Sequence, residues 1–131
     1  MIFLDTDIIS YYFNANIKIK KKILEAIDNN ENICTTVINI YEILKGFRWK
    51  NNKNKEIQFK EFLEDVIVFT IDDDVIEIAS EIYSNLRKNG KTIGDADILI
   101  AAIVIKNNGI LVTNNIKHYD DIRSLKLINW I

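Results

Sequence analysis

The sequence predicts an α/β fold in which helices cover both faces of a mostly parallel sheet of four to five strands, in three α/β/α layers. Two observations predict it. Short apolar segments alternate along the chain with longer segments of helical spacing, and strands joined through helices run parallel. The chain has 131 residues, of which 48% are apolar and 27% charged. Those values suit one soluble domain, residues 1–131, with a sizeable core.

The first half of the chain predicts two strands and four helices. Ile19, Ile23 and Ile27 recur every four residues, which is the spacing of one helix face. Thr36 is expected to cap the helix that follows it, because threonine is a favoured N-cap residue. In chain order we expect a strand at 2–4, a short helix at 8–13, a helix at 18–29, a strand at 33–35, and helices at 37–49 and 55–65.

The second half predicts two further helices and two or three strands. A helix beginning at Asp72 keeps its apolar period to Leu86, and Gly90 stands where a helix C-terminus favours glycine. The segment 95–106 is apolar almost all round after its first turn, which indicates a largely buried helix. The expected strands are at 66–70, 110–113 and 126–130.

Composition excludes some classes of protein. A single cysteine, Cys34, cannot form an internal disulfide, so we expect a reduced core residue and a cytoplasmic protein. No secretory signal is visible, and the longest apolar run, 98–105, is too short to cross a bilayer, so no membrane insertion is expected. The net charge of −2 neither predicts nor excludes a nucleic-acid partner.

Acids and amides from four separate segments are predicted to reach one edge of the sheet, because ligands of parallel sheets gather at the carboxyl ends of the strands. The side chains concerned are Asp5 and Asp7 after the first strand, Glu42 in the helix after the second, Asp95 and Asp97 at the start of the buried helix, and Asn114 and Asn115 after the fourth strand.

Such a cluster favours a metal site. Neighbouring carboxylates repel and raise one another's pKa, and a divalent cation removes that repulsion. Hard oxygen ligands without His or Cys suit Mg²⁺, or Mn²⁺, rather than Zn²⁺. A cation held in this way can activate water and stabilise charge on a phosphate under attack, so the site predicts phosphodiester hydrolysis.

Each residue also has a simpler interpretation. Asp7 could cap a helix at Ile8, and acids at the start of a helix are favoured by its dipole. Glu42 could be a solvated helix residue, and Asn114 and Asn115 could be turn formers. Only their joint placement favours a metal site.

Three stretches make the chain similar to a PIN domain, and specifically to a VapC-type toxin of a type II toxin–antitoxin pair. They are FLDTDIIS at the start, INIYEILKG in the middle and IGDADILIAAIVIKNNGILVTNN near the end. The resemblance covers nearly the whole chain. Its most specific part is the helix carrying D-x-L-I-A-A followed by L-V-T-N-N.

The resemblance implies a role for several residues. Asp5, Glu42 and Asp97 match the family's three metal-binding acids, and Asn115 falls at a fourth position where relatives carry an acid or an asparagine. These four are the expected catalytic residues. Supporting roles are implied for Asp7, Asp95 and Thr113, the last because it precedes the fourth position.

The activity implied is that of a Mg²⁺-dependent endoribonuclease that cuts RNA, is inhibited by a partner antitoxin protein and forms a homodimer. Six basic residues and one acid lie between Lys45 and Lys60, and an exposed aromatic among them could stack a base. A solvated Lys/Asn-rich helical hairpin is the simpler interpretation. His118, in an expected turn, is left out of the mechanism. The candidate RNA-binding residues are Lys45, Arg48, Trp49, Lys50 and Lys53.

Two rival functions remain open. Haloacid dehalogenase-like phosphatases also place D-x-D after a first strand and use its first aspartate as a nucleophile. Ile9 stands where they want Thr or Val, and the later acids begin a helix instead of ending a strand. The other rival is a non-catalytic PIN-like module that binds RNA or protein; the set of three acids argues against it and the missing fourth acid argues for it.

Overall fold

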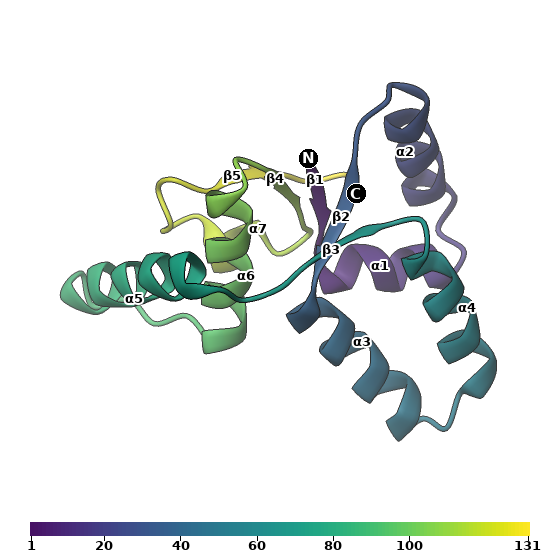
Figure 1. Cartoon of the computed structure of the whole chain (residues 1–131), viewed down its shortest axis with the longest axis horizontal. Helices are drawn as coiled ribbons and strands as arrows, with labels where there is room; N and C mark the ends of the chain where they lie inside the picture. Colours follow the sequence, from purple (N-terminus) through teal and green to yellow (C-terminus); the bar gives the residue numbers. More distant parts are fainter.

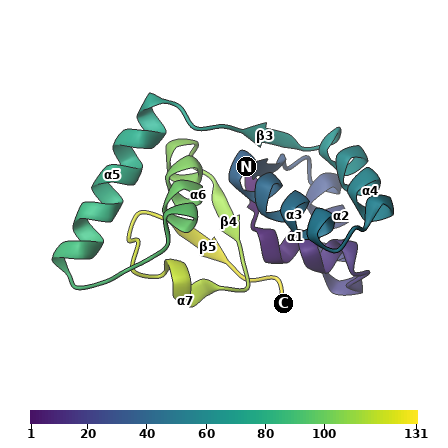
Figure 2. The same ribbon diagram turned by 90° about the horizontal axis from the view of Figure 1, so that it is seen from below.

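A computed structural model describes the whole chain, residues 1–131, as one parallel five-stranded sheet with helices on both faces (Figures 1 and 2). The strands are β1 (Ile2–Leu4), β2 (Ile33–Thr36), β3 (Ile67–Phe69), β4 (Ile110–Val112) and β5 (Lys126–Ile128). The helices are α1 (Thr6–Phe13), α2 (Ile17–Asp28), α3 (Val37–Trp49), α4 (Lys53–Leu63), α5 (Asp73–Lys88), α6 (Asp95–Lys106) and α7 (Ile116–Tyr119).

The strand order is β3-β2-β1-β4-β5, so the first strand in the sequence lies at the centre of the sheet. The chain adds β2 and β3 on one side of β1, then returns to add β4 and β5 on the other. The direction of winding therefore reverses between β1 and β4, where Phe3 pairs with Leu111. In open α/β sheets this reversal leaves a crevice at the carboxyl ends of the two strands, which is where ligands bind.

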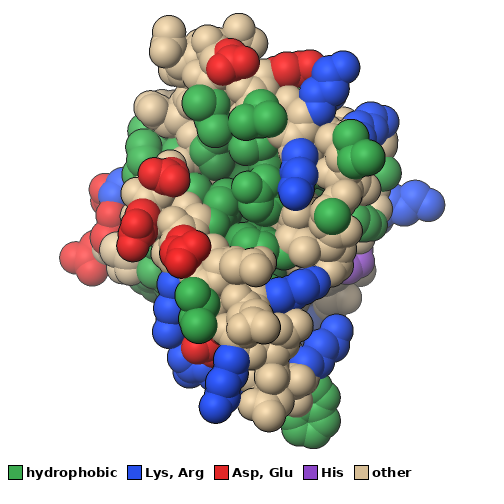
Figure 3. All heavy atoms as spheres, turned by 90° about the vertical axis from the view of Figure 1, so that its right-hand side faces the viewer, with side chains coloured by type: hydrophobic (Ala, Val, Ile, Leu, Met, Phe, Trp, Pro, Cys, Tyr) green, Lys and Arg blue, Asp and Glu red, His purple; other side chains and the backbone are tan.

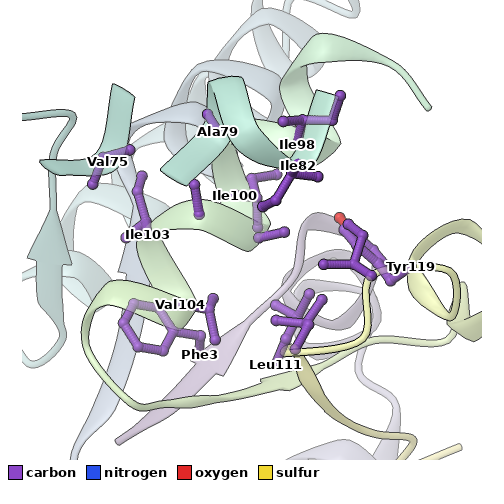
Figure 4. Packing of buried hydrophobic residues seen from close by; sticks show 14 of the residues in the cluster. Phe3, Val75, Ala79, Ile82, Ile98, Ile100, Ile103, Val104, Leu111 and Tyr119 are labelled. Atoms are coloured by element: carbon purple, nitrogen blue, oxygen red, sulfur yellow. The ribbon is translucent and has the colours of Figure 1, made fainter. Parts of the chain in front are cut away.

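Alternate residues of each strand face opposite layers, and this period of two produces two hydrophobic cores. Phe3, Cys34 and Leu111 pack with α5, α6 and α7, as Figure 4 shows for Phe3 and Leu111. Leu4 and Val112, from the same strands, pack with α1 to α4 on the other face. The three-layer arrangement predicted from the sequence is thereby confirmed.

Gly109 is required where α6 turns into β4. A Cβ at this position would lie 2.5 Å from Cε2 and 2.6 Å from Cδ2 of Phe3. Phe3 is fully buried, and its ring stands 5.1 Å from that of Phe69, so the ring has little room to move. Glycine thus lets the connection from α6 to β4 pass against the Phe3 ring at the amino end of β1.

Most predicted elements are confirmed, with ends that differ by one or two residues, and α6 has the predicted bounds. The predicted parallel arrangement extends to every strand pair of the sheet. Two details were wrong. The helix α7 was not foreseen, and α1 begins at Thr6 with Asp5 as its N-cap, so Asp7 does not cap a helix at Ile8. No helix combines the length and the apolar character that crossing a membrane requires.

Candidate active site

Asp5 is the centre of a buried polar cluster at the carboxyl end of β1. Its side chain is 5% exposed and accepts four hydrogen bonds. Oδ1 accepts from the Thr6 backbone N–H at 2.9 Å and from Asn39 Nδ2 at 3.1 Å. Oδ2 accepts from the Thr113 hydroxyl at 2.8 Å and from the Tyr119 hydroxyl at 3.2 Å. Donors from α1, α3, the end of β4 and α7 therefore fix this carboxylate from every side.

Asp97 lies in the first turn of α6, with its side chain 29% exposed. Its Oδ1 accepts a hydrogen bond from the Tyr119 hydroxyl at 3.1 Å, and its Oδ2 lies 3.5 Å from Nδ1 of His118. The Tyr119 hydroxyl thus stands between Asp97 and Asp5. Two of the three acids that the family resemblance selected, 92 positions apart in the chain, are linked through this one phenol.

Glu42 joins the cluster through α3. Its Oε1 accepts from the Thr6 hydroxyl at 2.7 Å, and that hydroxyl in turn accepts from Asn39 Nδ2 at 3.0 Å. Asn39 lies one turn before Glu42 and is held by the α3 cap, because the Thr36 hydroxyl donates to Asn39 Oδ1 at 2.6 Å. Thr36 caps α3 as predicted, and the cap also aims the amide that links Glu42 to Asp5.

Burial controls the electrostatics of the site. Loss of solvent raises the pKa of Asp5, the negative charge of Asp97 raises it further, and the hydrogen bonds from Thr113, Thr6 and Tyr119 oppose the increase. The pKa of Asp7 is also raised, first by burial and then by the charge of Asp5. Both carboxyls would ionise more readily with a cation beside them.

Asp7 supports the loop after β4. Its Oδ2 accepts from the Asn114 backbone N–H at 2.9 Å, and its Oδ1 accepts from the Ile8 backbone N–H at 2.7 Å. Both carboxylate oxygens therefore hold backbone in place. The supporting role of Asp7 in the site stays a prediction.

Two predicted residues keep their side chains outside the cluster. Asn115 is exposed at the N-cap of α7, and only its backbone N–H contributes, by donating to the Thr113 hydroxyl at 3.0 Å. Asp95 is exposed at the start of α6 and makes no hydrogen bond within the cluster.

The predicted RNA-binding residues lie outside the acidic cluster, on α3, in the turn to α4 and at the start of α4, and Trp49 among them is 90% exposed.

The cluster could hold one divalent cation. No three Asp, Glu, His or Cys side chains converge closely enough to surround an ion by themselves. The two acids nevertheless offer carboxylate oxygens as ligands, and Mg²⁺ characteristically binds one or two carboxylates while keeping several waters. Asp5 and Asp97 fit that requirement, and Glu42 is linked to Asp5 through Thr6 and Asn39.

The sequence did not single out Thr6, Asn39 or Tyr119. The sequence did contain a clue to Asn39, which is a polar residue in an otherwise apolar stretch one turn before Glu42. The structure shows that it is buried. No such clue marks Tyr119, because α7 is too short to show a period. His118 was assigned to a turn, whereas it lies on α7 beside Asp97.

Comparison with known proteins gives one consistent result. Residues 2–123 match the family model of the PIN domain. The chain is 33% identical over 97% of its length to Ribonuclease VapC2 of Rickettsia felis, of which it covers 96%. It is 32% identical over 96% of its length to Ribonuclease VapC1 of Methanocaldococcus jannaschii, covering 84% of that protein.

Solved structures give the same match. VapBC2 from Rickettsia felis, bound to a promoter DNA fragment, contains a chain that superimposes with a TM-score of 0.90 at 30% identity, and each chain is fully covered. VapBC-1 from nontypeable Haemophilus influenzae contains one with a TM-score of 0.85 at 29% identity, covering 99% of this chain and 98% of the other.

Proposed function

Because the chain belongs to the PIN domain family, we propose that it is an endoribonuclease, the toxin of a VapBC-type toxin–antitoxin pair. The observation that carries the proposal is the hydrogen-bond network that links Asp5 to Glu42, through Thr6 and Asn39, and to Asp97, through Tyr119, at the winding reversal of the sheet. Membership of this family also replaces the haloacid dehalogenase-like interpretation of the D-x-D motif.

We further propose that cleavage depends on Mg²⁺, or on Mn²⁺, held by Asp5 and Asp97. When bound, such a cation supplies positive charge to the phosphate under attack and lowers the pKa of a water molecule. A cation would take the place of one of the four donors to Asp5, and the remaining three would keep its orientation. Glu42 leaves Oε2 without a protein donor, and that oxygen is available to orient a water or accept its proton.

RNA would be bound away from the acids, along α3 and the turn to α4. Trp49 is 90% exposed and can stack on a base, while Lys45 lies with Nζ 5.1 Å from the ring centre of Tyr41. Lys50 and Lys53 are exposed beside them and can contact phosphates. Arg48 is less available, because its Nε pairs with Glu56 at 2.9 Å.

The antitoxin would bind the face formed by α2 and α4. Figure 3 views the molecule from this side and shows hydrophobic side chains gathered in the middle of the face. Ile17, Leu24 and Ile27 form an exposed apolar stripe on α2, which borders its buried side at Ile23, and are 82%, 62% and 52% exposed. Exposed apolar surface of this kind marks protein interfaces.

The proposal also includes a homodimer, which sedimentation of the purified chain would test.

The deciding experiment is cleavage of total cellular RNA by the purified chain, with Mg²⁺, with Mn²⁺ and with EDTA. Asp97→Asn is the test variant and Asp95→Asn its matched control, since Asp95 is an exposed acid two residues away on the same helix. We expect discrete metal-dependent cuts from the wild type and the control, and none from Asp97→Asn.

Equal cleavage by Asp97→Asn would overturn the assignment of the site. Folded wild-type protein that binds metal and makes no cuts would instead favour the non-catalytic module. Sequencing the fragment ends would identify the RNA target in the same experiment.

A further inference from the structure

Tyr119 places a hydroxyl inside the acidic cluster from the hydrophobic core. The side chain is 1% exposed and belongs to the core cluster between the sheet and α5 and α6. Figure 4 shows it at one end of that cluster, near Leu111 and Ile98. A buried ring has few rotamers open to it, so core packing fixes where the hydroxyl lies.

The hydroxyl lies 3.2 Å from Oδ2 of Asp5 and 3.1 Å from Oδ1 of Asp97. A phenol has one proton, so it donates to one carboxylate at a time and is shared by the pair. We propose that Tyr119 is a positioning residue, whose hydroxyl holds the Asp97 carboxylate toward Asp5 and so prearranges the two ligands for a divalent cation. The inference rests on the proposed metal-dependent function.

Asp97 depends on Tyr119 far more than Asp5 does. Asp5 keeps three other donors, from Thr6, Asn39 and Thr113, when the Tyr119 contact is removed. Asp97 keeps only the His118 imidazole, 3.5 Å away on a side chain that is 63% exposed.

Repulsion between the two acids acts against their approach. The Asp97 side chain is 29% exposed and begins a helix, so it has solvent to turn toward when no donor holds it. The Tyr119 hydroxyl offsets that repulsion with the one well-placed donor between the acids. A cation would then find two carboxylates already facing each other.

The test is Mn²⁺ binding by the full chain, measured by electron paramagnetic resonance and by calorimetry, with no RNA present. Tyr119→Phe keeps the ring and removes the hydroxyl. We expect its Mn²⁺ affinity to fall about tenfold, the usual effect of removing a group that orients a metal ligand. Tyr12→Phe is the matched control, because Tyr12 packs in the other core against Phe62 and its hydroxyl makes no hydrogen bond.

A double-mutant cycle separates positioning from a general structural effect. In an Asp97→Asn background, Tyr119→Phe should change Mn²⁺ affinity by less than twofold, because the residue through which it acts is already altered. Unchanged or tighter Mn²⁺ binding by Tyr119→Phe alone would overturn the inference. So would a tenfold loss that persists in the Asp97→Asn background.

Failure of the proposed function gives a different result. Wild-type protein that binds neither Mn²⁺ nor Mg²⁺ would overturn the metal-dependent function, and the inference with it. If Tyr119→Phe does not fold, NMR of the wild type replaces it. Adding Mg²⁺ should then shift the ring signals of Tyr119 and leave those of Tyr12 in place, and an unmoved Tyr119 ring would refute the inference.

Discussion

Replacement of Gly109 by alanine should destabilise the protein by forcing the Phe3 ring out of position. The new Cβ would lie 2.5 Å from Phe3 Cε2, whereas carbon atoms in contact prefer a separation of about 3.5–4.0 Å, so the ring must shift by about 1 Å. Overpacking of a close-packed core costs about 1–3 kcal/mol. Alanine recovers about 0.4–1 kcal/mol by restricting the unfolded chain.

The net loss is therefore about 1–2 kcal/mol, and a chain of this size should melt about 3–10 °C lower. Gly46→Ala is the control, because a Cβ there meets nothing within 4 Å and the residue lies inside α3. Alanine in a helix interior is more favourable by about 0.8–1 kcal/mol, so this variant should melt higher. Scanning calorimetry of both variants would measure the opposite shifts. A Gly109→Ala protein as stable as the wild type would refute the packing argument.

Three further predictions concern the site. Burial raises the pKa of Asp5, so its contribution to stability is full below the ordinary value of 3.8 and is lost as pH rises through the folded value. Metal-free Asp5→Asn should therefore resist urea better than the wild type at pH 7, and the gain should shrink toward pH 4; equal gains at both values would contradict this. Thr36→Val removes the α3 cap and the support of Asn39, so thermal melting should show a loss of about 1–2 kcal/mol, and an unchanged midpoint would count against the cap. Mg²⁺ at 100 times its Kd for the wild type should stabilise the wild type by about 2.7 kcal/mol in a thermal-shift assay and stabilise Asp97→Asn much less, whereas equal stabilisation would exclude Asp97 as a ligand.

Local sequence was enough to predict most of the fold. Thr36 was identified as a cap because its side chain bonds the backbone three residues ahead, an interaction that depends on neighbours in sequence alone. The bounds of α6 were predicted for the same reason, since acids begin it and Asn107 ends it. The positions of Asp5 and Asp97 followed from the rule that parallel strands bring their carboxyl ends to one edge.

The details of the site depend on packing, which local patterns do not encode. Whether Asp5 or Asp7 caps α1 is decided by the donors that reach Asp5 from α3, β4 and α7. Asn115 was predicted from the motif that contains it, yet its side chain is exposed while its backbone supports Thr113. Tyr119 could be found only after the sheet had brought residue 119 beside residues 5 and 97.

The central position of β1 also limits how early the sheet can fold during synthesis on the ribosome. β1 is translated first, but its partner β4 and the donors Thr113 and Tyr119 come from the last part of the chain. Domains fold as units while synthesis runs from the N-terminus, and pairing of segments so distant in sequence waits for the later one to emerge. A nascent chain that ends before residue 113 therefore carries all three acids but lacks Thr113 and Tyr119, two of the four donors to Asp5 and the phenol that links it to Asp97. The acidic cluster can therefore be completed only after residue 119 has been synthesised and has left the ribosome.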